Sequence, residues 1–315
     1  MRQTVSKNTR NGKPARRVLF YSHDTFGLGH LRRSRALAAA LMDGDEDASA
    51  IILTGSPVAG RFTFPKGVDH IRLPGVTKLV DGSYVAQSLH LDIDQVTSLR
   101  ANLIRTALEE YTPDLLIVDK EPTGFRGELL PGLDWLRENG TTKVVLGLRD
   151  VLDEPDVLAA EWERKGAVEA AEKFYDEIWV YGMHDVYDPT KGLPLSQAAH
   201  DRMHWTGYLR REAPEETPPA EEPYVLITPG GGGDGAAMVS LVLDAYEQDP
   251  DLTPNAKLIY GPFLSGDVRE AFDARVAKLG GRVTALGFDI RIEQLYVGAE
   301  GVVCMGGYNT FCEVL

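Results

Sequence analysis

The sequence predicts an α/β protein with two domains, each built around a parallel β-sheet. Short apolar runs alternate along the chain with longer stretches of helical periodicity. Several of the runs are apolar almost throughout, which is typical of strands that helices cover on both faces of a parallel sheet. The alternation stops at residues 210–223, where four prolines and five glutamates leave no apolar period, and then restarts. A chain of 315 residues has room for two such domains.

The first domain is expected to span residues 17–209. Its strands should be the apolar runs, and its helices the stretches of helical period between them. The expected strands lie at 17–23, 49–55, 69–75, 114–120, 143–149 and 177–182. The expected helices are Leu31–Met42, Ser88–Glu110, Gly132–Asn139 and Asp156–Phe174.

The second domain is expected to span residues 224–315, with 210–223 as the linker. Strands are expected at 224–229, 256–262, 282–288 and 301–306, and helices over Ala236–Gln248, Val268–Leu279 and Ile292–Ala299. A further helical pattern begins at Tyr308 and stops after about two turns. We therefore expect this domain to be incomplete and the sequence to be part of a longer one.

Charge and composition limit the possible partners. The formal charge is −14, from 33 basic and 47 acidic residues, which argues against general nucleic-acid binding. Residues 1–16 carry no acidic residue, and we predict a disordered basic tail there. A weak tether to an anionic membrane surface is the alternative. Without a secretory signal or an apolar run long enough to span a membrane, a cytoplasmic protein is expected, with peripheral contact to the inner membrane face as the alternative.

The two cysteines, Cys304 and Cys312, lack the spacing of a metal site or of a disulfide framework. The pair Asp92-x-Asp94 falls at a predicted helix start, where acidic residues favour the helix dipole, and is interpreted as structural. No metal and no other cofactor is expected.

The first glycine-rich loop follows the strand at 17–23. Gly27 and Gly29 allow close approach of the backbone to a ligand or to another segment. His30 stands at the helix start, where a neutral imidazole could take a proton from a hydroxyl group. The alternative is that His30 only caps or packs the turn.

Arginines follow this histidine in the first turns of the same helix. Cations are disfavoured at a helix N-terminus by about 0.3–1 kcal/mol each. Arg32 and Arg33 therefore predict an anion nearby, such as a diphosphate or a negatively charged acceptor.

The second domain contributes two more loops of interest. Gly231, Gly232 and Gly233 lie between a strand and a helix, where bare backbone N–H groups can cradle a phosphate. The loop lacks the G-K-[ST] ending of a Walker A motif and the setting of a dinucleotide fingerprint.

The other loop of this domain is CMGGYNTFCEVL, at 304–315. Asn309 and Thr310 offer amide and hydroxyl groups that suit a phosphate or a sugar. The carboxylate of Glu313 suits a ribose diol, and a solvated surface charge is the alternative.

Together these loops resemble those of the GT-B glycosyltransferases, in particular the family 28 group that contains the GlcNAc transferase making lipid II for peptidoglycan. The resemblance rests on GLGH at 27–30, PGGGGDGAA at 229–237 and CMGGYNTFCE at 304–313. As a whole the chain is most similar to bacterial predicted glycosyltransferases that carry a GLGHLRR loop. It implies two Rossmann-like domains facing a cleft, with the acceptor in the first and the nucleotide-sugar donor in the second.

The resemblance also implies roles for individual residues. A sugar would move, without a metal, from a nucleotide-diphosphate donor, expected to be a UDP-sugar, to a hydroxyl group of an unknown acceptor. His30 would be the base or an acceptor-side contact. The implied substrate contacts are Gly27, Gly29 and Arg33 in the first loop, Gly231, Gly232 and Gly233 at the diphosphate, Phe288 against the nucleobase, Gly307, Asn309 and Thr310 at the diphosphate or sugar, and Glu313 at the ribose.

Two other functions stay open. One group of nucleotide-sugar hydrolases has a similar G-x-G-H-x-x-R loop, here Gly27 to Arg33, and uses water as the acceptor. A non-catalytic protein that binds nucleotide sugars is the third reading.

Overall fold

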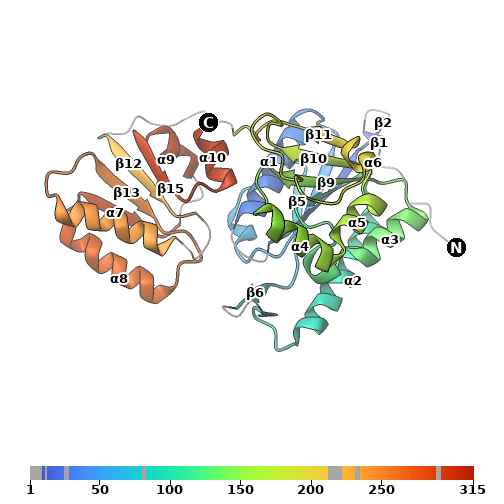
Figure 1. Ribbon diagram of the computed structural model, residues 1–315, viewed down its shortest axis with the longest axis horizontal. Coiled ribbons are helices and arrows are strands. Elements are labelled where there is room, and N and C mark those ends of the chain that lie inside the picture. Colours follow the sequence, from blue (N-terminus) through green and yellow to red (C-terminus); the bar gives the residue numbers. More distant parts are fainter. Residues whose placement is uncertain are drawn as a thin grey trace. The chain divides into compact units, whose positions relative to one another are not determined.

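The computed structural model describes residues 9–10, 13–24, 28–79, 83–211, 222–230, 235–288 and 292–315. The chain forms two compact units, one up to Leu209 and one from Arg210, with residues 27–29 grouped with the second. Each unit has a parallel sheet with helices packed on it (Figure 1). The predicted α/β class with parallel sheets is confirmed. Most of the predicted linker lies outside the described residues.

The first unit holds a seven-stranded sheet in the order β11-β10-β9-β8-β3-β4-β5, in which every pair of neighbours is parallel. Six of its strands are the predicted ones, and β11 is an addition. The strands are β3 (Arg17–Ser22), β4 (Ser49–Thr54), β5 (Val68–Arg72), β8 (Leu115–Asp119), β9 (Lys143–Arg149), β10 (Glu177–Tyr181) and β11 (Met203–Trp205).

The helices of this unit follow the prediction with two corrections, and α6 is an addition. They are α1 (Gly29–Asp43), α2 (Ile93–Tyr111), α3 (Leu130–Asn139), α4 (Pro155–Lys165), α5 (Ala167–Phe174) and α6 (Gln197–His200), with short 3₁₀ turns at Ala59–Arg61 and Phe125–Gly127. Helix α2 begins five residues later than predicted because Asp92 and Gln95 form a capping box at its start. The helix predicted over Asp156–Phe174 is two helices, because Gly166 adopts a left-handed conformation with φ 61°.

Two hairpins complete the unit. Within the predicted disordered tail, β1 (Thr9–Arg10) pairs with β2 (Lys13–Pro14), and further along β6 (Val76–Lys78) pairs with β7 (Tyr84–Ala86). In the described part of the chain, no helix has the length and apolar character needed to cross a membrane.

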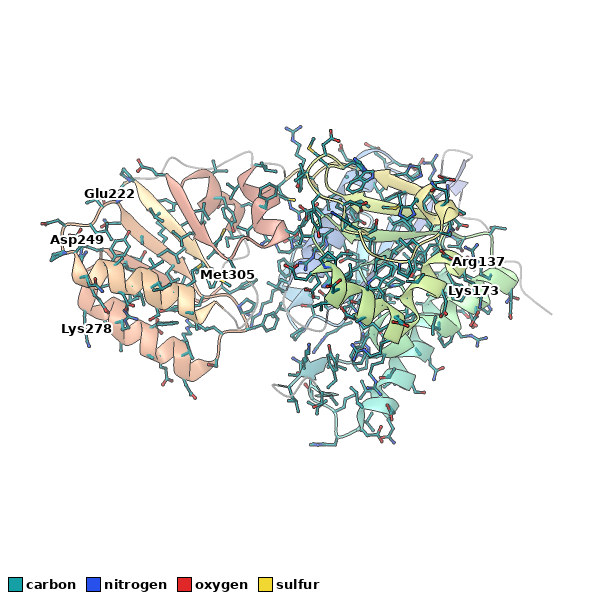
Figure 2. All side chains as sticks on the ribbon, in the orientation of Figure 1. Arg137, Lys173, Glu222, Asp249, Lys278 and Met305 are labelled. Carbon is teal, nitrogen blue, oxygen red and sulfur yellow. The ribbon has the colours of Figure 1, made fainter. Side chains whose placement is uncertain are left out.

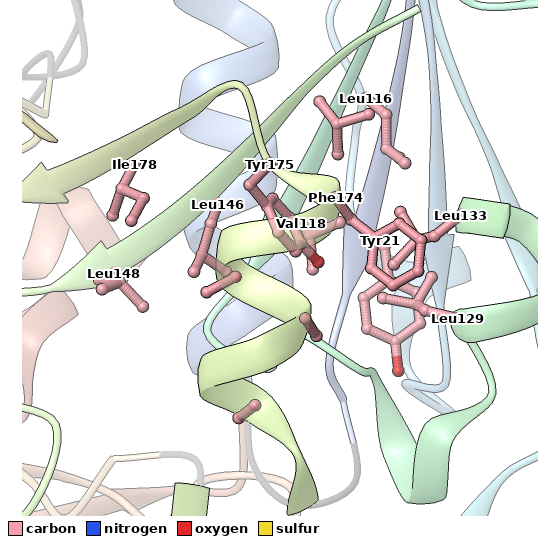
Figure 3. Close-up of a cluster of buried hydrophobic side chains, with 14 of the residues drawn as sticks. Tyr21, Leu116, Val118, Leu129, Leu133, Leu146, Leu148, Phe174, Tyr175 and Ile178 are labelled. Carbon is pink, nitrogen blue, oxygen red and sulfur yellow. The ribbon is translucent and has the colours of Figure 1, made fainter. Parts of the chain in front are cut away.

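The core of the first unit lies on both faces of its sheet. Leu116 and Val118 of β8 pack with α3 and α5 on one face (Figure 3). Ile117, between them, packs with Leu31 and Ala38 of α1 on the other face. This two-residue alternation assigns Asp119, the last residue of β8, to the face that α1 covers.

The second unit has a four-stranded parallel sheet in the order β14-β13-β12-β15. Its strands are β12 (Tyr224–Thr228), β13 (Asn255–Ile259), β14 (Val283–Leu286) and β15 (Gly301–Cys304). Its helices are α7 (Ala236–Gln248), α8 (Gly266–Val276), a 3₁₀ turn at Ala277–Leu279, α9 (Ile292–Val297) and α10 (Tyr308–Val314). All predicted strands of this domain are confirmed, and α7 has the predicted bounds.

In each sheet there is a strand after which the chain stops adding strands on one side and continues on the other side. In the first unit the chain runs from β3 to β4 and β5, then returns to β8 on the other side of β3. In the second it runs from β12 to β13 and β14, then returns to β15 beside β12. Ligands of open α/β sheets bind at the carboxyl ends of the strands at such switch points. The loops after β3 and β8, and those after β12 and β15, are therefore where a site is expected.

Candidate active site

His30 and Asp119 meet at the switch point of the first unit. Asp119 ends β8, and His30 is the second residue of the helix that follows β3. The His30 Nδ1 atom lies 2.6 Å from Asp119 Oδ2. The aspartate side chain is 4% exposed and the histidine side chain 16% exposed, so the histidine lies between the carboxylate and solvent.

Arg33, one turn further along α1, binds the same carboxylate. Its Nε donates to Asp119 Oδ1 at 3.1 Å, and its Nη2 donates to Oδ2 at 2.9 Å. Burial alone would raise the pKa of Asp119, but the charges and hydrogen bonds of Arg33 and His30 outweigh it and hold the pKa well below its usual range. Asp119 is thus a carboxylate that can only accept hydrogen bonds.

This ionisation fixes the tautomer of His30. Because Asp119 cannot donate, the short contact requires the proton on Nδ1, and the Nε2 atom of the neutral ring carries the lone pair. The 3.0 Å approach of Arg33 Nη2 to Nδ1 is then a consequence of two donors sharing Oδ2. The arrangement is that of a histidine base oriented by a carboxylate.

Asp24 anchors the start of α1. Its Oδ1 accepts from the backbone N–H of Leu31 at 3.1 Å, which satisfies a helix-start donor. Its Oδ2 accepts from the hydroxyls of Ser22, at 2.6 Å, and Thr54. Since these residues end β3 and β4, Asp24 ties the histidine-bearing turn to two strands.

A second histidine, His23, lies beside the first. The two ring centroids are 5.6 Å apart and the rings are nearly perpendicular. Burial lowers the pKa of His23 to about 3, although the nearby Glu121 carboxylate acts in the opposite direction. His23 is therefore uncharged near neutral pH. Glu121 is paired with Lys165 at 2.8 Å; burial raises its pKa, but His23, Lys120 and Lys165 outweigh this and lower it to about 2.

The predicted residues of the first loop are placed as follows. Gly27 lies outside the described residues, and Gly29 is the first residue of α1. Arg33 is 2% exposed and bound to Asp119, so its predicted substrate contact stays a prediction. Arg35 donates to the Thr63 carbonyl and lies over the rings of Phe62 and Phe64, and this packing accounts for a third arginine in the turn.

The described donor residues follow strands of the second unit at one edge of its sheet. Figure 2 shows Met305, which follows β15, at the opposite end of the sheet from Glu222, which precedes β12. Gly231, Gly232 and Gly233 lie outside the described residues. Phe288 comes two residues after β14, and Gly307 is the N-cap of α10.

The polar side chains of α10 are largely covered. Asn309 Oδ1 accepts from Arg211 Nη2 at 2.8 Å. Thr310 is 9% exposed, and both carboxylate oxygens of Glu313 are shielded from solvent. The fold thus brings these residues to the predicted edge, while their contacts with a donor stay predictions.

Sequence reasoning missed Asp119. The only signal was an acidic residue at the end of the apolar run DLLIVDK, at 114–120. The interpretation of Asp92 and Asp94 was right: Asp92 caps α2, and Asp94 pairs with Arg126 at 2.7 Å. Among the described residues no three His, Cys, Asp or Glu side chains are grouped so that they could hold a metal ion.

Comparison with known proteins gives structural matches but no sequence match. No protein-family model matches the chain, and no curated protein does. A glycosyltransferase from Rickettsia africae ESF-5 matches with a TM-score of 0.56 at 12% identity, covering 92% of this chain and 73% of that one. A UGT transferase from Siraitia grosvenorii in complex with UDP matches with a TM-score of 0.53 at 11% identity, covering 95% and 79%. These matches decide the fold.

The chain has the GT-B fold. A UDP-N-acetylglucosamine 2-epimerase also matches, with a TM-score of 0.56 at 10% identity, covering 93% of this chain and 74% of that one. The GT-B fold therefore accommodates more than one reaction, and the reaction of this chain has to be argued from its own residues.

Proposed function

We propose that the protein is a glycosyltransferase that moves a sugar from a nucleotide-diphosphate donor, a UDP-sugar, to a hydroxyl group of an acceptor. The observation that carries the proposal is the His30–Asp119 pair at the switch point of the first sheet. Transfer to a hydroxyl group needs a base, and an oriented neutral imidazole is a suitable one. The UDP in the matching UGT transferase from Siraitia grosvenorii supports the choice of donor.

In this proposal His30 Nε2 takes the proton of the acceptor hydroxyl as its oxygen attacks the sugar. Asp119 keeps the proton on Nδ1 and stabilises the imidazolium that forms. Arg33 acts through Asp119, which it keeps ionised and fixed by two hydrogen bonds. A positioned base of this kind contributes about 10²–10⁴-fold to a rate.

The second domain, 224–315, would bind the donor, and the first, 17–209, the acceptor. Gly231, Gly232 and Gly233 would offer backbone N–H groups to the leaving diphosphate, with no metal ion. Phe288 would lie against the base, Glu313 at the ribose, and Gly307, Asn309 and Thr310 at the diphosphate or sugar. We propose a cytoplasmic location, with the basic segment 1–16 as a weak tether to an anionic membrane surface.

The test is the release of UDP from UDP-sugars by the full chain, offered a panel of saccharide acceptors. His30→Gln and Asp119→Asn should each lower turnover per folded molecule by about 10²–10⁴-fold and leave UDP binding intact. His200→Gln is the matched control, because His200 is an exposed histidine of α6. Full turnover in His30→Gln would rule out His30 as the base. The absence of any UDP-sugar binding would rule out a UDP-sugar as the donor.

Hydrolysis of nucleotide sugars is the second candidate. The observation that favours hydrolysis concerns the G-x-G-H-x-x-R pattern shared with the hydrolases. The histidine and the arginine of this pattern, His30 and Arg33, both bind the Asp119 carboxylate. A water molecule could give its proton to His30 as readily as an acceptor hydroxyl could. Free sugar formed at the same rate with and without saccharides would favour the hydrolase, and UDP binding without turnover would favour a non-catalytic protein.

A further inference from the structure

Arg149 and Tyr181 have polar atoms without partners close to the His30–Asp119 pair. They end the neighbouring strands β9 and β10 and are paired in register. Asp119 is paired with Gly147, two residues before Arg149, so all three side chains share the face that α1 covers. The Arg149 Nε atom and the Tyr181 hydroxyl are shielded from solvent and bond to no described residue.

The guanidinium of Arg149 makes little use of its donors. Its Nη2 donates to the Leu152 carbonyl at 3.1 Å. No carboxylate of the described residues forms an ion pair with it, whereas Arg33, Lys120 and Lys165 each have one within 4 Å. A buried N–H without a partner costs free energy and indicates a role for a water or an ion.

The charges around Arg149 do not supply the missing partner. Asp119 attracts it, but the oxygens of that carboxylate are held by Arg33 and His30. Asp150 and Asp153 also attract it, yet each accepts a hydrogen bond from the next backbone N–H of its own loop. Arg33 repels it. The result is a partly buried cation near Asp119 with no counter-ion of the described residues in contact.

We propose that Arg149 binds an oxyanion, a carboxylate or a phosphate group, carried by the acceptor. This rests on the proposed function of the same site and names its acceptor class, an anionic hydroxyl compound. The planar guanidinium matches both oxyanions through paired hydrogen bonds. The arginines after His30 led us to expect an anion nearby. We assign this anion to Arg149, because Arg33 is already paired with the Asp119 carboxylate.

The first test observes Arg149 itself, in the full chain with ¹⁵N-labelled arginine. The shielded Nε–H should exchange slowly and give a resolved resonance, assigned by its loss in Arg149→Lys. Inorganic phosphate or acetate should shift it saturably, and chloride at equal ionic strength should not. The resonance of Arg126, an exposed arginine paired with Asp94, is the control and should stay in place. The proposal is overturned if neither oxyanion moves the Arg149 resonance more than chloride does.

The second test separates a free anion from an anion on the acceptor. Glucose and glucose 6-phosphate, and methyl β-glucoside and methyl β-glucuronide, are compared as matched neutral and anionic ligands. The wild-type chain should prefer at least one anionic member about tenfold, the equivalent of one good hydrogen-bonded contact. Arg149→Gln should lose the preference and Arg126→Gln should keep it. A response to free phosphate or acetate with no preference in either pair would overturn the acceptor assignment.

Both readouts are independent of turnover. If UDP-sugars neither bind nor react while the Arg149 resonance responds, the proposed function fails and the anion site stands. If UDP-sugars are turned over and the Arg149 resonance does not respond, the proposed function stands and the anion site fails.

Discussion

Asp119 binds the side chains of both Arg33 and His30, on a strand end with almost no solvent contact. Replacing it with asparagine leaves the Arg33 charge buried at 2% exposure without its counter-ion. Breaking a buried pair in this way costs about 3–5 kcal/mol. We therefore expect Asp119→Asn to lower the free energy of unfolding by that amount in urea denaturation, apart from its effect on turnover.

Asp94→Asn is the matched control for this prediction. Asp94 forms a 2.7 Å ion pair with Arg126, and both side chains are well exposed. Exposed pairs contribute about 0–1 kcal/mol. Equal losses in the two variants would show that Asp119 and Arg33 are not a buried pair.

His23 should make the protein less stable in mild acid. Its folded-state pKa is about 3, against about 6.5 when unfolded. Between these values the unfolded state binds more protons, so stability falls as the pH falls. From pH 6.5 to 5 the loss should be about 1–2 kcal/mol. Glu121, His30, Lys120 and Lys165 are the charged or titratable groups that act on this histidine.

The variant His23→Asn should remove this part of the pH dependence, measured as urea unfolding at pH 6.5 and 5. His200→Asn, at an exposed position, should leave it unchanged. A further loss of stability below about pH 4 is expected from protonation of Asp119 and Glu121, because their folded-state pKa values are lowered. An unchanged slope in His23→Asn would contradict the burial of a neutral ring.

Tyr181→Phe should not destabilise the protein. The Tyr181 hydroxyl is buried without a partner among the described residues, and removing such a group is neutral or stabilising. In Tyr175 the buried hydroxyl donates to the Pro122 carbonyl at 2.6 Å, so Tyr175→Phe should cost about 1 kcal/mol. Equal losses in thermal unfolding would mean that Tyr181 has a partner, such as a bound water.

At this scale the sequence could predict His30 but not Asp119. A histidine that follows the sequence Gly27-Leu28-Gly29 at a predicted helix start stands out without any knowledge of the fold. Asp119 becomes meaningful only when β8 is known to lie beside β3, and 89 residues separate the two partners. The sequence of the loop after β3 also could not predict that Arg33 binds Asp119, a carboxylate of the chain itself.

Among the elements, the break between α4 and α5 shows the limit of periodicity. The apolar period continues through Gly166, so the sequence predicts one helix, and a single glycine inside such a pattern is tolerated. The left-handed conformation of Gly166 is what ends α4. Strands β6, β7 and β11 were missed because three residues are too few to show an alternation.

Gly166→Ala should therefore cost about 1–2 kcal/mol, because a residue with a Cβ atom is strained in this conformation. Gly266→Ala is the control: Gly266 begins α8, and a Cβ atom there would meet open space. That variant should be neutral or slightly stabilising. If urea unfolding gives Gly166→Ala the stability of the wild type, the helix break must have another cause.

For the whole molecule, the sequence predicted the two parallel sheets because most strands are short apolar runs followed by a helix. The order of strands within each sheet could not be predicted, since apolar runs do not reveal their neighbours. That order creates the two switch points and decides which loops meet. The fold class was therefore accessible from the sequence, and the pairing of site residues was not.

If the second unit binds the donor at its switch point, UDP should protect a defined set of backbone amides. In hydrogen exchange of the full chain, slower exchange is expected after β12 and β15, at residues 229–235 and 305–310. A ligand at 100 times its dissociation constant stabilises the fold by about 2.7 kcal/mol, enough to slow exchange clearly. Uridine, which lacks the diphosphate, should protect the segment around Phe288 and leave the glycine loop unchanged. Protection confined to the loops after β3 and β8 would instead place the nucleotide in the first unit, and the donor would have to be reassigned to it.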